Sequence, residues 1–195
     1  MKTLAVAVLV FAISGCVSWP YTDVPLTWKP TSDLHYGSTT LTGIFAEKFK
    51  ILPFTDTRSN PKEIARNTEE AEAKTVTTKD DVATWCTGRF ISILQQYGIT
   101  TTESDETVRV KSEILNFYVT EDSLYRASVG LRITVEDTSG KILWKGLASG
   151  TAKRFGRSYS MENYYEALSD AYVEAVNNFL GNPELAAELK SRGKL

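Results

Sequence analysis

The sequence is poor in the residues that most catalytic and metal-binding sites require. It contains one histidine, His35, and two cysteines, Cys16 and Cys86. One histidine leaves a single base for any Ser-His-Asp or Cys-His arrangement, and it falls in a proline-containing stretch that is unsuited to holding catalytic geometry. The glycines are scattered at expected turns and form no phosphate-binding loop. These shortages favour a protein that is not an enzyme and needs no metal or cofactor.

Strong charge and long hydrophobic runs are also missing. The 195 residues include 22 basic and 24 acidic ones, and no basic stripe indicates nucleic-acid binding. The composition, 42% apolar and 24% charged, is typical of a globular domain. The apolar run that starts at Leu4 covers only about half a bilayer, which indicates an export signal rather than a membrane span.

That signal ends in Ile13-Ser14-Gly15-Cys16, which resembles a bacterial lipobox. The resemblance implies cleavage of residues 1–15, diacylglycerol on the Cys16 thiol and acylation of the new amino group. Two or three acyl chains anchor a protein stably, whereas one is marginal. The alternative is an ordinary secretory signal. Lipidation of Cys16 would leave Cys86 alone, which excludes an internal disulfide.

The lipobox resemblance also brings a sorting rule, in which Asp at the second mature position retains a lipoprotein in the inner membrane. Val17 occupies that position. In a Gram-negative host, the protein is therefore expected at the outer membrane, on its periplasmic face.

Residues 16–43 are predicted to be a lipidated tether, stiffened by Pro20, Pro25 and Pro30. Residues 44–195 are predicted to form the single folded domain. Two readings of the tether aromatics stay open. Trp19 could lie in the headgroup zone, whereas Val24-x-Leu26-x-Trp28 alternates like an edge strand docked on the domain.

Hydrophobic periodicity predicts two long amphipathic helices over residues 79–97 and 161–180, with Cys86 buried on the face of the first. Strands are predicted over 44–54, 108–119, 125–135 and 142–153, with a bulge between Ile114 and Leu115. The polar residues 55–78 are expected to be a long connection. The predicted fold class is a single α+β domain, with a mixed or antiparallel sheet of about four to five strands and order β-α-β-β-β-α.

Several stretches resemble the YajG-like family of bacterial lipoproteins, over most of the chain after Phe49. They are Ile51–Arg58, Asp81–Trp85, Val110–Ile114 and Asn178–Leu180. The Pro-Phe-Thr-Asp-x-Arg element at 53–58 is also similar to auxiliary lipoproteins of envelope ABC-type lipid transporters. Neither resemblance brings catalytic residues with it.

Two polar features are candidate binding sites. Asp56 and Arg58 follow a predicted central strand, and the Arg58 guanidinium could clamp a phosphate or carboxylate. The alternative is a local ion pair that shapes the loop. Arg154 and Arg157 belong to an aromatic-basic stretch that could contact headgroups or a partner, or could simply connect a hairpin to a helix.

The leading functional hypothesis is a non-enzymatic adaptor or binding module in the cell envelope, with an envelope protein or lipid as its partner. An alternative is an auxiliary subunit of a lipid or toxic-compound transporter that binds a hydrophobic ligand. A cell-wall or lipid hydrolase that uses two carboxylates is a third hypothesis.

Overall fold

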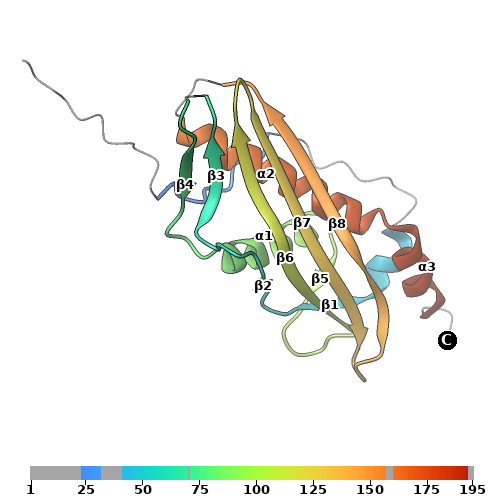
Figure 1. Cartoon of the computed structure of the whole chain (residues 1–195). Coiled ribbons are helices and arrows are strands. Elements are labelled where there is room, and N and C mark those ends of the chain that lie inside the picture. The colour runs from blue at the N-terminus through green and yellow to red at the C-terminus, as the bar shows by residue number, and fades with distance from the viewer. Residues whose placement is uncertain (1–22, 32–40, 70, 157–159, 193–195) are drawn as a thin grey trace, which may run out of the picture.

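The computed structural model describes residues 23–31, 41–69, 71–156 and 160–192 (Figure 1). In chain order the elements are the 3-10 helix η1 (Leu41–Ala46), β1 (Lys48–Ile51), β2 (Thr55–Asp56), β3 (Glu63–Asn67), β4 (Lys74–Thr77), α1 (Val82–Gln96), β5 (Thr100–Thr101), β6 (Val108–Glu121), β7 (Tyr125–Asp137), β8 (Ile142–Arg154), α2 (Met161–Leu180) and α3 (Pro183–Arg192). All eight strands belong to one mixed sheet. The prediction of four to five strands in the order β-α-β-β-β-α is therefore wrong, because four strands precede α1 and four lie between α1 and α2.

Strand β6 is the centre of this sheet. Along one edge it pairs with β7 over its full length, antiparallel, and β7 pairs in the same way with β8. Along its other edge it pairs in succession with the short parallel strands β1, β2 and β3. Strand β5 then extends the sheet beside β1, and β4 extends it beside β3.

The extra strands come from two stretches whose sequence signal is weak. Residues 44–54 were expected as one strand, but η1 occupies the first three of them and β1 holds only four residues. Residues 55–78 were expected as a connection, but they form β2 and the β3–β4 hairpin. β2 buries no apolar side chain, and β1, β3 and β4 each bury only one or two, such as Ile64 and Val76. Pairing with β6, or with β3 in the case of β4, holds them in place rather than intrinsic β propensity.

The three long strands β6, β7 and β8 begin at the predicted residues and end one or two residues beyond the predicted bounds. In β7, buried and partly exposed residues alternate over most of the strand. The register between β6 and β7 shifts between Ile114 and Asn116, which confirms the predicted bulge. The Asn116 amide at this bulge donates to the Ser128 hydroxyl at 2.6 Å.

Helix α1 begins and ends close to the predicted bounds. Its N-cap is Asp81, whose carboxylate accepts from the Thr84 amide at 2.7 Å. That hydrogen bond lowers the pKa of Asp81. Gly98 ends the helix with a φ of 76°, a left-handed conformation that glycine adopts without steric cost.

Helix α2 has the predicted bounds and lies directly against β8. A Cβ atom on Gly150 would stand 2.1 Å from the Ala171 carbonyl oxygen, so only glycine allows this approach. Glu174 accepts from the Thr151 amide, and the Asn178 amide donates to the Ser149 carbonyl at 2.7 Å. Helix α2 thereby pairs with part of the free edge of β8.

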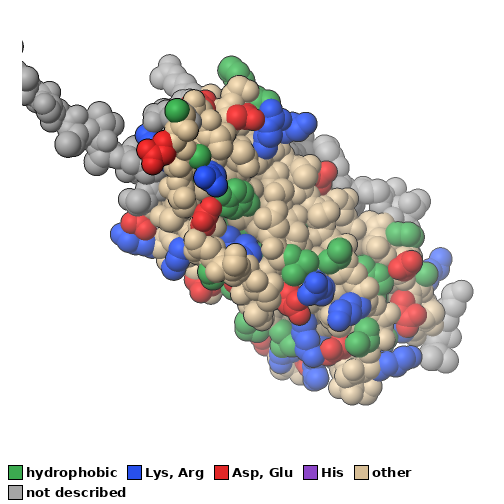
Figure 2. All heavy atoms as spheres, viewed as in Figure 1, with side chains coloured by type: hydrophobic (Ala, Val, Ile, Leu, Met, Phe, Trp, Pro, Cys, Tyr) green, Lys and Arg blue, Asp and Glu red, His purple; other side chains and the backbone are tan. Residues whose placement is uncertain are grey.

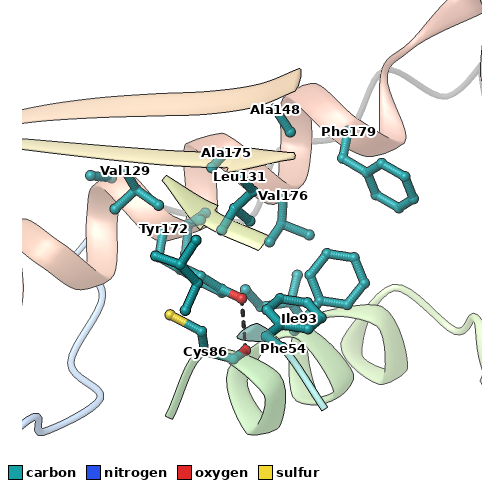
Figure 3. Close-up of a cluster of buried hydrophobic side chains, with 14 of the residues drawn as sticks. Phe54, Cys86, Ile93, Val129, Leu131, Ala148, Tyr172, Ala175, Val176 and Phe179 are labelled. Atoms are coloured by element: carbon teal, nitrogen blue, oxygen red, sulfur yellow. Dashed lines mark hydrogen bonds between the residues drawn. The ribbon is translucent and has the colours of Figure 1, made fainter. Parts of the chain in front are cut away.

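The core lies between the sheet and the two long helices (Figure 3). Phe90 of α1 and Phe179 of α2 meet with ring centroids 5.5 Å apart. Cys86 is fully buried, as predicted, and burial raises the pKa of its thiol. The Tyr172 hydroxyl donates to the Cys86 carbonyl at 2.7 Å, which ties α2 to α1.

Candidate functional site

The structure places three of the five residues that the sequence singled out. Asp56, Arg58 and Arg154 are described, whereas Cys16 and Arg157 lie outside the described residues, as does His35. The described ones fall into two separate clusters, one beside β2 and one between β8 and α2.

The first cluster is built around Arg58, which follows the two-residue strand β2. The Arg58 Nε and Nη2 groups donate to the two carboxylate oxygens of Asp56 at 2.9 and 2.7 Å. The two Nη groups also donate to three carbonyl oxygens, those of Glu63, Phe117 and Pro61, at 2.7 to 3.0 Å. The guanidinium carbon stands 5.7 Å from the centre of the Phe117 ring.

These contacts use all five N–H donors of the guanidinium. The Arg58 and Asp56 side chains are only 8% and 11% exposed. Of the two possibilities that the sequence left open, a ligand clamp or a local ion pair, the structure has the local ion pair. It joins the loop after β2 to β3 and β6. A ligand phosphate would have to displace Asp56 before it could engage Arg58.

The second cluster involves residues 23–31, which belong to the expected tether but pack against the domain. The Asp23 and Val24 amides both donate to the Thr77 carbonyl, at 3.0 and 2.8 Å. The Leu26 amide donates to Asp80 at 2.6 Å, and its carbonyl accepts from the Trp85 indole at 2.6 Å.

Apolar contacts accompany these hydrogen bonds. Val24 and Leu26 are buried in the core, and the rings of Trp28 and Trp85 stand edge to face at 5.6 Å. Of the two sequence readings, this corresponds to packing of Val24, Leu26 and Trp28 on the domain, although none of them is in a strand.

Beyond Trp28 the segment meets what we call the docking cluster, which consists of Lys29, Thr31, Arg154, Glu162, Glu166 and Asp170. Lys29 pairs with Glu162, and with Glu166 at 2.9 Å. The Thr31 amide and hydroxyl donate to the two oxygens of Asp170, each at 2.6 Å. Arg154 pairs with Glu166 and donates to the Thr31 hydroxyl at 2.6 Å.

The carboxylates of this cluster outnumber its cations by three to two. Glu166 and Asp170 are each 7% exposed, so their charges depend on the cations that face them. Hydrogen bonds from Lys29 lower the pKa of Glu162, and hydrogen bonds to Glu162 and Glu166 raise the pKa of Lys29. The cluster therefore fastens the N-terminal segment to α2 and β8 through charge as well as hydrogen bonds.

Sequence reasoning found Arg154 but missed its partners. The signal that could have revealed them is the placement of Glu162, Glu166 and Asp170 at intervals of four residues. On a helix this spacing forms one acidic row beside the apolar face. No local pattern could name Lys29 and Thr31 as the residues that meet it.

A further buried polar group lies at the same end of the sheet. Glu121 is fully buried and accepts from the Tyr164 hydroxyl. The rings of Tyr164 and Tyr125 meet edge to face at 5.0 Å. Burial, together with the hydrogen bond to Glu121, raises the pKa of both tyrosines. This group joins the start of α2 to β6 and β7.

The described residues include no group of three or more His, Cys, Asp and Glu side chains that could hold a metal ion. Within the same residues, no helix is long and apolar enough to cross a membrane. Two open hollows of about 360 and 230 Å³ lie along β6, the first beside Pro53, Lys111 and Arg132, the second beside Arg58, Asn60 and Tyr118.

No protein-family model matches the chain, and no curated protein matches its sequence. Its fold is similar to that of protein XCC0632 from Xanthomonas campestris, of family DUF330, with 10% identity, a TM-score of 0.57 and coverage of 75% of this chain and 88% of that one. A second solved structure, of an uncharacterized protein, has 9% identity, a TM-score of 0.52 and coverage of 70% and 92%.

Lipoprotein GNA1162 from Neisseria meningitidis is more distant, with 11% identity, a TM-score of 0.36 and coverage of 59% of this chain and 90% of that one. A TM-score this low does not establish a shared fold. The likeness to the first two structures establishes a shared fold and assigns no activity.

Proposed function

We propose that the chain is a YajG-like lipoprotein, held at the outer membrane by acyl chains on Cys16, that acts as a non-enzymatic adaptor or binding module in the envelope. The observation that carries this proposal is the Ile13-Ser14-Gly15-Cys16 lipobox at the end of a short apolar run. The packing of residues 23–31 supports it, since a segment close behind the lipidation site is built into the domain.

A second support is the open face of the sheet, which we define as the side chains of β6, β7 and β8 that point away from the core. Both long helices pack on the opposite face, around Phe117 and Tyr172. The open face carries the ion pairs Lys111–Glu136 and Arg132–Glu113, and Leu147 beside them is 69% exposed. Figure 2 shows basic, acidic and hydrophobic side chains interspersed over the lower half of the molecule. Such a mixed surface suits a protein partner better than an acyl chain.

Attachment is tested first, by mass spectrometry of the N-terminal peptide from the protein purified out of native envelopes. The expected result is a mature chain that begins at a triacylated Cys16 and fractionates with the outer membrane. The Cys16→Ser variant should be released from the membrane with its fold unchanged. An unmodified Cys16 inside a longer mature chain would contradict the proposal.

The adaptor role is tested with a photo-reactive amino acid at position 147, cross-linked in native envelopes. The expected result is one recurring protein partner, which is lost when Arg132→Glu and Lys145→Glu are added. A probe at Ala187, exposed on α3, is the matched control and should not capture that protein. Equal capture at both positions, or capture of lipid alone, would contradict a protein-binding open face.

A further inference from the structure

The point where the chain is first fastened to the domain limits how far the domain can stand from a membrane. Asp23 is held by the Thr77 carbonyl at 3.0 Å and by Lys79 at 2.9 Å. Only seven peptide steps separate Asp23 from Cys16. Even a fully extended chain of that length spans no more than about 25 Å. A lipid on Cys16 would therefore keep this part of the domain close to the bilayer surface.

The docked segment, residues 23–31, lies at one end of an elongated domain. It runs from β4, at Thr77, to the last residue of β8, Arg154, and to the first turns of α2. Figure 1 places the β3–β4 hairpin and the start of α2 at this end, whereas α3 and the β7–β8 turn lie at the opposite end. Strand β6, with 14 residues, gives the sheet a length of roughly 45 Å.

The end that holds the docked segment carries two exposed apolar side chains. Phe155, directly after Arg154, is 85% exposed, and Met161, the first residue of α2, is 39% exposed. Lys153, two residues before Phe155, is exposed as well. An aromatic ring and a thioether next to a lysine suit the boundary between headgroups and acyl chains, where the apolar parts are buried and the ammonium stays in water.

We infer that this end of the domain lies on the lipid bilayer, with Phe155 and Met161 inserted at the headgroup level. The inference rests on the proposed lipidation of Cys16, and it adds a second membrane contact and a fixed orientation. The membrane-contact end is the one formed by residues 153–156, the start of α2 and the docked segment. The β7–β8 turn and α3 point away from the membrane. The open face lies along the side of the domain, where a partner can reach it.

The test compares the two ends of β8, because both carry an exposed apolar residue. Ile142, at the far end of this 13-residue strand, is 54% exposed. An environment-sensitive fluorophore is attached to Phe155→Cys or Ile142→Cys in the full-length lipidated protein, reconstituted in phosphatidylethanolamine–phosphatidylglycerol vesicles. Cys86 is buried and the Cys16 thiol is blocked by diacylglycerol, so labelling is confined to the new cysteine.

The expected result is a blue-shifted emission at position 155 that is quenched by brominated lipids, and an aqueous, unquenched emission at position 142. Quenching at 142 but not at 155, or at neither position, would overturn the inference. Mass spectrometry and vesicle flotation of the same samples test the proposed function separately. A protein that is triacylated and floats, but whose label at 155 stays aqueous, keeps the lipoprotein proposal and refutes the orientation.

Discussion

The cluster around Arg58 and the docking cluster around Arg154 differ in the sequence separation of the residues that they bring together. Arg58 takes its carboxylate from two residues away and most of its carbonyl contacts from within five residues. Arg154 instead joins Thr31, 123 residues away, to the acidic row on α2. Arg58 is the more deeply buried of the two. The first cluster shapes a loop, whereas the second decides whether the N-terminal segment belongs to the domain.

The largest effect is expected from breaking the Arg58 cluster. Arg58→Met would leave the largely buried Asp56 carboxylate and three carbonyl oxygens without their donor, so the free energy of unfolding should fall by about 3–5 kcal/mol. Urea unfolding in the Cys16→Ser background measures this change. Arg66→Met, at an exposed position on β3, is the matched control. A loss no greater than that of the control would mean that the ion pair is dispensable.

A smaller effect is expected from Arg154→Gln. Lys29 and Thr31 would still face Glu166 and Asp170, so the free energy of unfolding should fall by about 1–3 kcal/mol. Limited proteolysis should in addition detect release of the segment that precedes Thr31. Lys153→Gln, the exposed neighbour, should change neither quantity. Full protease resistance in Arg154→Gln would show that the hydrogen bonds of Asp23 to Leu26 suffice for docking.

The contribution of Lys29 should depend on pH and salt. Because the Glu162 pKa is lowered in the folded protein, the pair contributes stability above the ordinary glutamate value of 4.5, and loses it as the pH falls through the folded pKa. The pKa of Lys29 is raised in the folded protein, so the pair also loses its contribution to stability when the pH rises through that folded pKa, which lies above the ordinary lysine value of 10.5. The difference in unfolding free energy between wild type and Lys29→Gln should therefore vanish in acid and shrink in 1 M NaCl. A difference that is constant with pH would contradict an ionic role for Lys29.

The smallest effect is expected on the open face. Arg132 and Glu113 pair across β6 and β7 with side chains that are 44% and 46% exposed, so Arg132→Gln should change the unfolding free energy by about 0–1 kcal/mol. The same urea experiment measures it. A loss as large as that of Arg154→Gln would mean that the open face is as strongly coupled to folding as the docking cluster.

The sequence predicted the elements whose signal repeats many times within one stretch. Both long helices and the strands β6 and β7 carry six or more periodic positions, β8 runs for 13 residues, and even the bulge at Ile114 left a visible parity slip. Strands β2 to β5 have two to five residues each; β2 and β3 pair with the edge of β6, whereas β4 pairs with β3 and β5 with β1. These strands are too short to show a hydrophobic period in the sequence, which is why the predicted number and order of strands were wrong.

The same distinction applies to the polar residues. Asp56 and Arg58 could be paired from the sequence because two residues separate them. The partners of Arg154 could not, since Thr31 lies 123 residues before it and only the folded sheet brings the two together. Prolines in residues 16–43 suggested a tether, whereas the alternation of Val24, Leu26 and Trp28 left docking on the domain open, and Val24 and Leu26 are core residues. Spacing within a segment can indicate that the segment packs on the domain, but it does not name the residues that the segment meets.

The most direct test of the account is amide hydrogen exchange on the full-length lipidated protein bound to vesicles. The Asp23, Val24, Leu26, Lys29 and Thr31 amides each donate to a partner on the domain, so all five should be protected to a degree approaching that of α2. Protection at Lys29 and Thr31 should fall in Arg154→Gln, because Arg154 no longer holds the Thr31 hydroxyl. Exchange of these amides at the rate of an unstructured chain would show that residues 23–31 are a free tether, and the short connection to the membrane would be refuted.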